Sequence, residues 1–231
     1  MKISYIHHSC FSIELEKSIL LFDYYQGTLP NFNPEKAIYV FSSHNHNDHF
    51  SFSIFAIMEM YPNVHYIFSK DIKKRYNEKF FLSHGIDKST YNQITFIPAN
   101  SIFSTNEMQV ETLTSTDEGV AFIVSIDNKT IYHAGDLHLW LWSGEGDDFN
   151  KNIDYLFKLE MAKIKSRHFD VAFLVLDPRQ GNDFYLGFDY FMRNTNTDLV
   201  YPMHFWNDNS VISRLKSMEC STPYRAKIAD I

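Results

Sequence analysis

Three apolar stretches of this chain each end in side chains of the types that bind metal ions. The first, residues 37–43, is followed at once by four such residues: His44, His46, Asp48 and His49. The stretches TIYHAGD and DLVYPMH end in Asp136 and His204. A string of imidazoles and carboxylates buries badly in a core, and a single Asn would cap a turn as well. We therefore expect a fold that brings three strand ends together, because loops held by a rigid sheet commonly carry function.

The string H-x-H-x-D-H favours two metal ions over one. In an extended segment successive side chains alternate faces, so His44, His46 and Asp48 lean one way and His49 leans the other. Nitrogen and oxygen ligands at this spacing suit a divalent metal such as Zn²⁺. Asp48 and His49 are adjacent and would join the ion of both preceding histidines only with strain. A dinuclear site accommodates all four side chains.

Composition and charge exclude several classes of protein. Of the 231 residues, 45% are hydrophobic, which is enough for a sizeable core. No run approaches the roughly 18 uncharged apolar residues of a membrane-spanning helix. The first ten residues lack the apolar centre of a secretory signal, so we expect a cytoplasmic protein with no membrane partner. The net charge of −7 argues against nucleic acid as a partner.

Strand-like and helix-like runs alternate along the chain. Apolar or alternating runs predict strands at residues 2–6, 10–16, 18–23, 37–43, 64–69, 94–99, 109–115, 120–126, 130–136, 170–177 and 198–204. Helical runs are predicted at residues 51–61, 71–82, 149–164 and 209–219. Many short strands with interspersed helices indicate an α/β fold in which two packed sheets are covered outside by helices.

Two hairpins echo each other in the two parts of the chain. The run FSIELEKSILLFD ends in Asp23, and the run AFIVSIDNKTIYHAGD ends in Asp136. No low-complexity or Pro/Gly-rich linker divides the sequence. We expect one domain over residues 1–231, built from two similar halves with a boundary near residues 115–120.

The order of these motifs resembles that of the metallo-β-lactamase fold superfamily. H-x-H-x-D-H, then AGD, then a lone histidine after a late buried strand follow the family's order over almost the whole chain. The opening YIHHSCFSIE, followed by ILLFD, is similar to the branch that contains the ascorbate-6-phosphate lactonase. The resemblance implies a four-layer αββα sandwich with the metals at the edge between its two sheets.

The resemblance also implies a ligand for each position of the motifs. His44 and His46 would hold metal one, and Asp48, His49 and His204 would hold metal two, with Asp136 bridging. A hydroxide on the metals would attack a carbonyl or phosphoryl centre, because divalent ions lower the pKa of bound water to about 7. Asp48 would orient this nucleophile as the catalytic residue.

One departure from the family concerns metal one. The family supplies a third histidine from a loop that corresponds to TSTDEG, residues 114–119, and this loop has none. Asp117 either replaces it as an oxygen ligand or merely caps a turn. An oxygen ligand would make metal one harder and less selective for zinc, and with no replacement metal one would bind weakly. We expect two divalent ions, zinc first, with manganese or iron as alternatives.

Four further residues are candidates for substrate contact or for support of the ligands. His8 lies near the site by the same resemblance, or it is a packed or surface histidine. His133 supports the site or is an ordinary strand histidine. Asp177 and Arg179 end another strand, where Arg179 either clamps an anionic substrate or pairs with a neighbouring acid. After Asp136, the run LHLWLWSGEG places His138, Trp140 and Trp142 at alternate positions, as in a strand, where they line a substrate mouth or belong to the core.

Two functions are compatible with these residues. The first is a metal-dependent hydrolase acting on a small ester, lactone, thioester or phosphoester, for which an anionic substrate would suit Arg179. The second is a metal-binding sensor or interaction protein with little turnover, which the altered TSTDEG loop favours. The near-complete ligand set favours the enzyme. The substrate and the oligomeric state are left open.

Overall fold

The computed structural model describes residues 1–231, which form two six-stranded sheets. The first sheet holds its strands in chain order: β1 (Lys2–His7), β2 (Cys10–Glu14), β3 (Ser18–Phe22), β4 (Ala37–Ser42), β5 (Val64–Ser69) and β6 (Thr95–Ile97). Strands β1 to β3 are antiparallel, and β3 to β6 are parallel.

The second sheet is formed from the rest of the chain. Its strands are β7 (Ile102–Ser104), β8 (Met108–Thr114), β9 (Val120–Ile126), β10 (Lys129–His133), β11 (His168–Val175) and β12 (Asn196–Met203). Strands β7 to β10 are antiparallel, and β10 to β12 are parallel. The chain passes between the sheets at residues 98–101, earlier than the predicted boundary near residues 115–120, which falls at the β8–β9 turn. The organisation as one domain of two similar halves stays a prediction.

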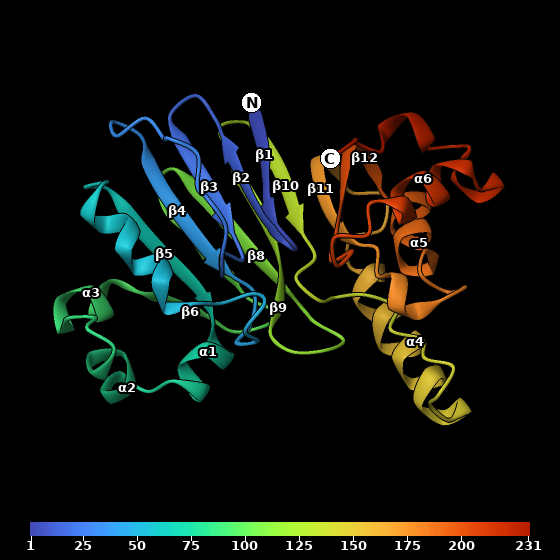
Figure 1. Cartoon of the computed structure of the whole chain (residues 1–231), viewed down its shortest axis with the longest axis horizontal. Helices are drawn as coiled ribbons and strands as arrows, with labels where there is room; N and C mark the ends of the chain where they lie inside the picture. Colours follow the sequence, from blue (N-terminus) through green and yellow to red (C-terminus); the bar gives the residue numbers. More distant parts are fainter.

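Helices cover the outer faces of the two sheets (Figure 1). The first sheet carries a 3₁₀ helix (Phe52–Glu59) and three short helices, α1 (Lys70–Arg75), α2 (Glu78–Ser83) and α3 (Lys88–Gln93). The second sheet carries α4 (Asp147–Ala162), α5 (Leu186–Asn194) and α6 (Ser210–Ser217). Short 3₁₀ turns lie at Pro178–Gln180, Glu219–Ser221 and Arg225–Lys227. No helix in the structure is both long enough and apolar enough to cross a bilayer.

The alternation of side chains along each strand divides the apolar residues into two cores. On the first sheet, one set of side chains joins a cluster of 47 residues shared with the second sheet: Phe11, Leu20, Phe22 and Phe41. The neighbouring positions face the outer helices in a cluster of 18 residues: Cys10, Ile19, Leu21 and Val40. This period of two is what an extended strand buried on both faces requires. The predicted αββα layering is therefore confirmed.

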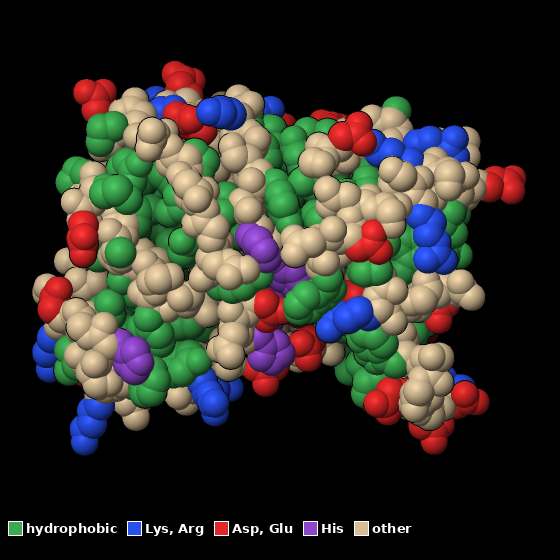
Figure 2. Space-filling model, in the orientation of Figure 1, with side chains coloured by type: hydrophobic (Ala, Val, Ile, Leu, Met, Phe, Trp, Pro, Cys, Tyr) green, Lys and Arg blue, Asp and Glu red, His purple; other side chains and the backbone are tan.

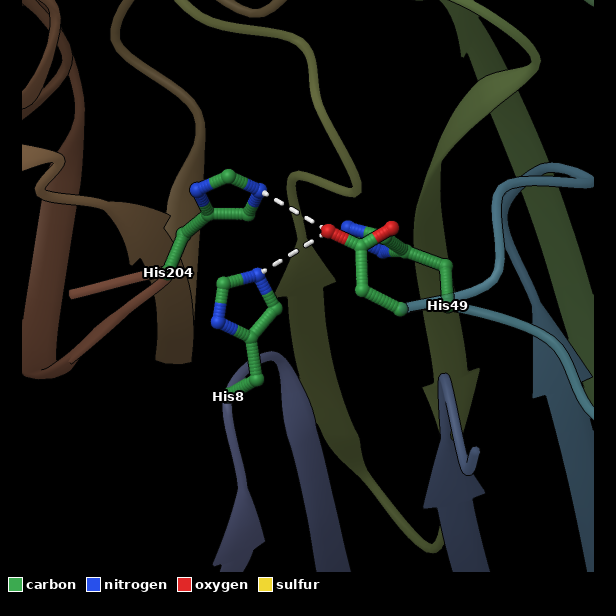
Figure 3. A group of neighbouring side chains, drawn as sticks. His8, His49 and His204 are labelled. Atoms are coloured by element: carbon green, nitrogen blue, oxygen red, sulfur yellow. Dashed lines mark ion pairs between the residues drawn. The ribbon is translucent and has the colours of Figure 1, made fainter. Parts of the chain in front are cut away.

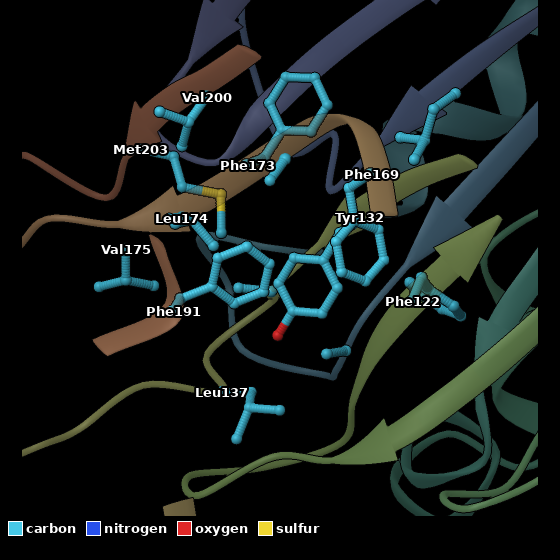
Figure 4. Packing of buried hydrophobic residues seen from close by; sticks show 14 of the residues in the cluster. Phe122, Tyr132, Leu137, Phe169, Phe173, Leu174, Val175, Phe191, Val200 and Met203 are labelled. Atoms are coloured by element: carbon cyan, nitrogen blue, oxygen red, sulfur yellow. The ribbon is translucent and has the colours of Figure 1, made fainter. Parts of the chain in front are cut away.

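The larger core is rich in aromatic rings (Figure 4). Tyr132 of β10 packs against Phe191 of α5 with ring centroids 4.6 Å apart. Phe11 of the first sheet meets Phe173 of the second at 4.6 Å. Each buried ring stabilises the fold by roughly 1.5–3 kcal/mol relative to exposure. Apolar side chains of this shared core thus hold the two sheets face to face.

The eleven strand ranges given above all correspond to strands of the structure, and the differences lie in the helices and in the irregular segment around Trp140. The run 71–82 is two helices, because the chain turns at Tyr76 and the Asn77 side chain caps α2 through the Phe80 N–H. The run 51–61 is a 3₁₀ helix, and the short elements β7, α3 and α5 were not predicted. Predicted helix 149–164 is α4, shifted by two residues at each end.

Two glycines let loops of the second sheet approach the end of β4. A Cβ on Gly119 would lie 2.0 Å from the carbonyl oxygen of Ser43, and Gly119 has a positive φ of 69°. A Cβ on Gly135, whose φ is 51°, would lie 2.7 Å from the Ser43 Cβ. The carbonyl oxygen of Ser43 also accepts a hydrogen bond from Val120 N–H at 3.0 Å. Close backbone contact at Ser43 therefore joins the two sheets beside His44.

We predict that Gly119→Ala lowers the free energy of unfolding by more than about 1 kcal/mol, because both the conformation and the space exclude a methyl group. Chemical denaturation measures this. The matched control is Gly144→Ala, since a Cβ at Gly144 meets nothing within 4 Å. Equal stability of the two variants would contradict the contact at Ser43.

Candidate metal centre

Two groups of side chains meet at the edge where strand ends of both sheets come together. The first group consists of His44, His46, Asp117 and Asp136. The second group consists of His8, Asp48, His49 and His204. Within each group, one nitrogen or oxygen atom per residue lies within 4.8 Å of the others. Figure 2 shows histidine and acidic side chains gathered at the centre of one face of the molecule.

The buried carboxylate of Asp136 lies between the two groups. Its Oδ2 is 3.7 Å from Nε2 of His44. Its Oδ1 is 3.3 Å from Nε2 of His49 and 3.6 Å from Nε2 of His204. One oxygen therefore faces the first group and the other faces the second, which is the arrangement that a bridging ligand needs.

The first group is open to solvent on one side. His44 is fully buried, and its Nε2 lies 3.1 Å from Nδ1 of His46. The side chains of His46 and Asp117 are 42% and 44% exposed, and Asp117 Oδ2 lies 3.5 Å from His46 Nδ1. The loop TSTDEG thus places Asp117 among the candidate ligands. Thr116 fixes this loop, because its hydroxyl accepts from His138 N–H at 3.0 Å.

The imidazoles of the second group are buried, the side chain of Asp48 is 27% exposed, and the group includes His8. Nε2 of His8 lies 3.4 Å from Oδ2 of Asp48, and Nε2 of His204 lies 4.0 Å from the same oxygen. Figure 3 shows these two ring nitrogens directed at one carboxylate oxygen, with His49 beside them. His8 is therefore not an ordinary surface histidine.

Asp23, at the end of β3, supports the first motif from behind and was not among the predicted site residues. Its Oδ2 lies 2.8 Å from Nδ1 of His49 and accepts from the Ser43 hydroxyl at 2.7 Å. That hydroxyl is 2.9 Å from Nδ1 of His44. Burial raises the pKa of Asp23 to about 6, although His133 and Ser43 lower it. The signal in the sequence was the echo of two hairpins that each end in an aspartate.

Asp177 supports His204 in the same way. Its Oδ2 lies 3.0 Å from Nδ1 of His204 and accepts from the Trp206 indole N–H at 3.2 Å. Carboxylates that hold the second nitrogen of a histidine commonly fix the ring of a metal ligand. Arg179 donates to both oxygens of Asp177 at 3.0 Å through Nε. Arg179 thus pairs with an acid two residues away, and its role toward a substrate stays a prediction.

His133 and His138 lie outside both groups. His133 stacks on Phe22 in the core, with its Nε2 2.9 Å from the carbonyl oxygen of Ser9. Among the acidic side chains of the site, His133 approaches Asp23, with 3.8 Å between its Nδ1 and Oδ2 of Asp23. His138 is buried with its Nε2 2.8 Å from Oε1 of Gln180, and burial lowers the pKa of His138 to about 4. His138 therefore joins the loop after Asp136 to the 3₁₀ turn that contains Gln180.

Several donor and acceptor atoms of the site lack hydrogen-bond partners. Nε2 of His8, Nε2 of His49 and Oδ1 of Asp136 are buried without one. Buried polar atoms are rarely left in this state, because each costs desolvation energy. Burial lowers the pKa of His49 and raises that of Asp136, whose charge neighbouring carboxylates also disfavour. A cation placed among these atoms would stabilise the charged carboxylate of Asp136, and the ring nitrogens of the histidines would coordinate it.

The spacing of these atoms fits divalent metal ions as well. Two ligand atoms about 2.0–2.1 Å from a tetrahedral ion lie roughly 3.3 Å from each other. The distance from His8 Nε2 to Asp48 Oδ2 is 3.4 Å, and that from His49 Nε2 to Asp136 Oδ1 is 3.3 Å. The residues therefore fit the metal pair that the motifs predict. The assignment of each residue as a ligand stays a prediction.

Three residues of the site adopt left-handed backbone conformations. The φ angles are 54° for His8, 47° for Asp23 and 64° for His204. Such a conformation costs a non-glycine residue roughly 1–2 kcal/mol. Strain of this kind persists where the surrounding structure imposes it and often marks a functional site. The strained backbone at these three residues therefore agrees with a functional site here.

A cavity of about 310 Å³ opens above the two groups. Its walls carry four aromatic side chains: Trp140, Trp142, Phe149 and Trp206. The segment around Trp140 is irregular, not the predicted strand, and it lines the cavity. Arg179 also lines the cavity, with its guanidinium 4.6 Å from the ring centroid of Trp206. The cavity is large enough for a small organic molecule.

Known proteins resemble this chain in sequence over more than half of its length. The family described as "Beta-lactamase superfamily domain" matches residues 2–159. A metal-dependent hydrolase from Nanoarchaeum equitans is 32% identical over 145 residues, which span 59% of this chain and 60% of the relative. The chain thus covers less than two thirds of that relative's length.

Solved structures match over nearly the whole chain. A metallo hydrolase from Ignicoccus hospitalis matches 99% of this chain and 94% of its own, with a TM-score of 0.61 and 17% identity. A protein from Parabacteroides distasonis matches 98% of this chain and 90% of its own, with a TM-score of 0.62 and 16% identity. At this identity the likeness concerns the fold, and it agrees with the αββα layering. The chain belongs to the beta-lactamase superfamily and has the metallo-β-lactamase fold.

Proposed function

We propose that this protein is a metal-dependent hydrolase that acts on a small ester, lactone, thioester or phosphoester. The observation that carries the proposal is the pair of candidate ligand groups beside a cavity, with the carboxylate of Asp136 between them. Relatives named as metal-dependent hydrolases support it. The cavity volume of about 310 Å³ suits a substrate of small-molecule size.

The residues divide into two ligand sets. His44, His46 and Asp117 would hold the first ion, and Asp48, His49 and His204 the second, with Asp136 shared. Bound ions of this kind polarise a carbonyl or phosphoryl oxygen and lower the pKa of water to about 7. Zinc fits the histidine-rich second set, whereas the carboxylate of Asp117 makes the first set more tolerant of manganese or iron.

Asp48 would orient the attacking water. Its side chain is 27% exposed and lines the cavity. Burial alone would raise the pKa of Asp48, but the imidazoles of His8, His49 and His204 lower it below its ordinary value. The carboxylate therefore stays ionised at neutral pH and accepts a hydrogen bond from water.

Aromatic walls and one arginine would position the substrate. Trp140 and Trp142 lie nearly parallel, with an interplanar angle of 7°, and expose apolar surface to the cavity. Arg179 brings a positive charge to the same wall, and Asp177 fixes its direction. An apolar group beside an anionic group is the chemistry that these walls would bind.

A metal-binding sensor or interaction protein is the second candidate. The exposure of His46 and Asp117 favours it, because an open first site would exchange its ion readily. The cavity with its aromatic walls favours the enzyme, since a sensor that binds only metal needs no cavity of this size beside the ions. A metal-replete protein that turns over no ester or phosphoester would favour the sensor.

We predict that Asp136→Asn lowers the metal content from about two ions to one or none per chain and reduces ester or phosphoester hydrolysis by at least about 100-fold. The amide keeps the shape of the side chain but removes the charge between the two groups. Metal analysis and a substrate screen of the purified protein measure the two effects. The control is Asp230→Asn at the surface, where the aspartate side chain is 91% exposed. Full activity of Asp136→Asn would refute the proposal.

We predict that Asp117→His raises the affinity of the weaker site for Zn²⁺ relative to Mn²⁺ by about tenfold, because imidazole prefers zinc and carboxylate prefers harder ions. Competition with a chromophoric chelator measures the ratio. Glu118→His is the matched control, since Glu118 also approaches His46, at 3.9 Å, but belongs to neither ligand group. An unchanged ratio for Asp117→His would mean that Asp117 is no ligand.

A further inference from the structure

We propose that His8 is a direct ligand of the second metal ion, which is then held by His8, Asp48, His49 and His204 and binds before the first ion. The resemblance to the family implies no ligand from the β1–β2 turn, so His8 would be an addition to the predicted set. The inference rests on the metal centre of the proposed function but not on hydrolysis.

The first reason is the unpaired nitrogen of His8. Its ring is 2% exposed, and Nε2 has no hydrogen-bond partner. The 3.4 Å to Asp48 Oδ2 is long for an N–H···O hydrogen bond, whose donor and acceptor lie 2.7–3.2 Å apart in most proteins. It agrees with the roughly 3.3 Å between two ligands of one tetrahedral ion. A metal ion would satisfy both atoms at once.

The second reason is the way in which the backbone holds His8. The residue lies in the turn between β1 and β2 with a φ of 54°. Its N–H donates to the Tyr5 hydroxyl at 2.9 Å, and its carbonyl oxygen accepts from His204 N–H at 3.3 Å. The rings of His8 and His204 consequently lie side by side, with centroids 4.1 Å apart. Figure 3 shows His8 directed from the turn toward the other histidines.

The third reason is the difference between the two sites. The imidazoles of the second group are all buried, with His8 and His204 at 2% exposure and His49 at 0%. In the first group, His46 and Asp117 are each more than 40% exposed. With His8, the second site has three buried nitrogen ligands and the carboxylate of Asp48, which is 27% exposed, whereas the first has one buried and one exposed nitrogen and the exposed carboxylate of Asp117; Asp136 lies between the two sites. The second site should therefore fill first and release its ion last.

The test is a zinc titration of the metal-free protein against a chromophoric chelator. His8→Asn is the variant of choice, because Asn tolerates the left-handed conformation and is too short to reach the ion. We expect the tighter of the two affinities to fall by more than about 100-fold, beyond the roughly 10–100-fold loss typical of residues that only support a ligand. His7→Asn is the control, since His7 contacts Tyr25 and belongs to neither ligand group. It should leave both affinities unchanged.

A second comparison separates a ligand from a residue that only orients Asp48. In an Asp48→Ala background, loss of His8 should weaken zinc binding further and change the visible spectrum of the Co²⁺-loaded protein. His8→Gly adds a rescue, because free imidazole should restore the tight site in the space that the side chain leaves. Thermal unfolding of the metal-free variants checks that each one folds.

Two results would overturn the proposal. One is an affinity of His8→Asn within about threefold of the parent protein, well below the loss expected even for a supporting residue. The other is an effect of His8 that disappears in the Asp48→Ala background. The titration uses no substrate, so a protein that binds zinc as expected but hydrolyses nothing would contradict the proposed function and leave the role of His8 supported.

Discussion

A carboxylate buried without a hydrogen-bond partner for one of its oxygens is the constraint on which this site depends. Asp136 sits between the imidazoles of His44, His49 and His204, and further carboxylates surround it. Burial and like charge both oppose its ionised form, so the arrangement is stable as an anion only beside a cation. The rest of the site places neutral nitrogen atoms around the same space, and this combination is what a divalent metal pair requires.

The fold brings these groups together through strained backbone and close backbone contacts, and the packed core offsets their energetic cost. Gly119 and Gly135 allow loops of the second sheet to press on Ser43 of the first, and a side chain at either position would push the motifs apart. His8 and His204 have left-handed backbone conformations, which are unfavourable for residues other than glycine. Two apolar layers of packed aromatic rings supply the stability that lets such strain persist.

Much of this organisation could be predicted from the sequence, since strand period and strand-end chemistry are local signals. Eleven predicted strands exist, the segment around Trp140 is irregular instead, and the predicted ligands converge. What the sequence could not indicate depends on contacts between distant segments. Asp23 supports His49 through a hydrogen bond across the loop, and His8 faces Asp48 only because its backbone is left-handed. The bond of Arg179 to Asp177 is local by contrast, because the two residues lie two positions apart in one turn.

The central claim is that the two ligand groups hold two divalent ions bridged by Asp136. The most direct test is a crystal structure with the native metals, in which anomalous scattering locates the ions. We predict two peaks, one among His44, His46 and Asp117 and the other beside His49, with Asp136 contacting both. A single ion elsewhere, or peaks that leave Asp136 without a metal contact at full loading, would contradict the account.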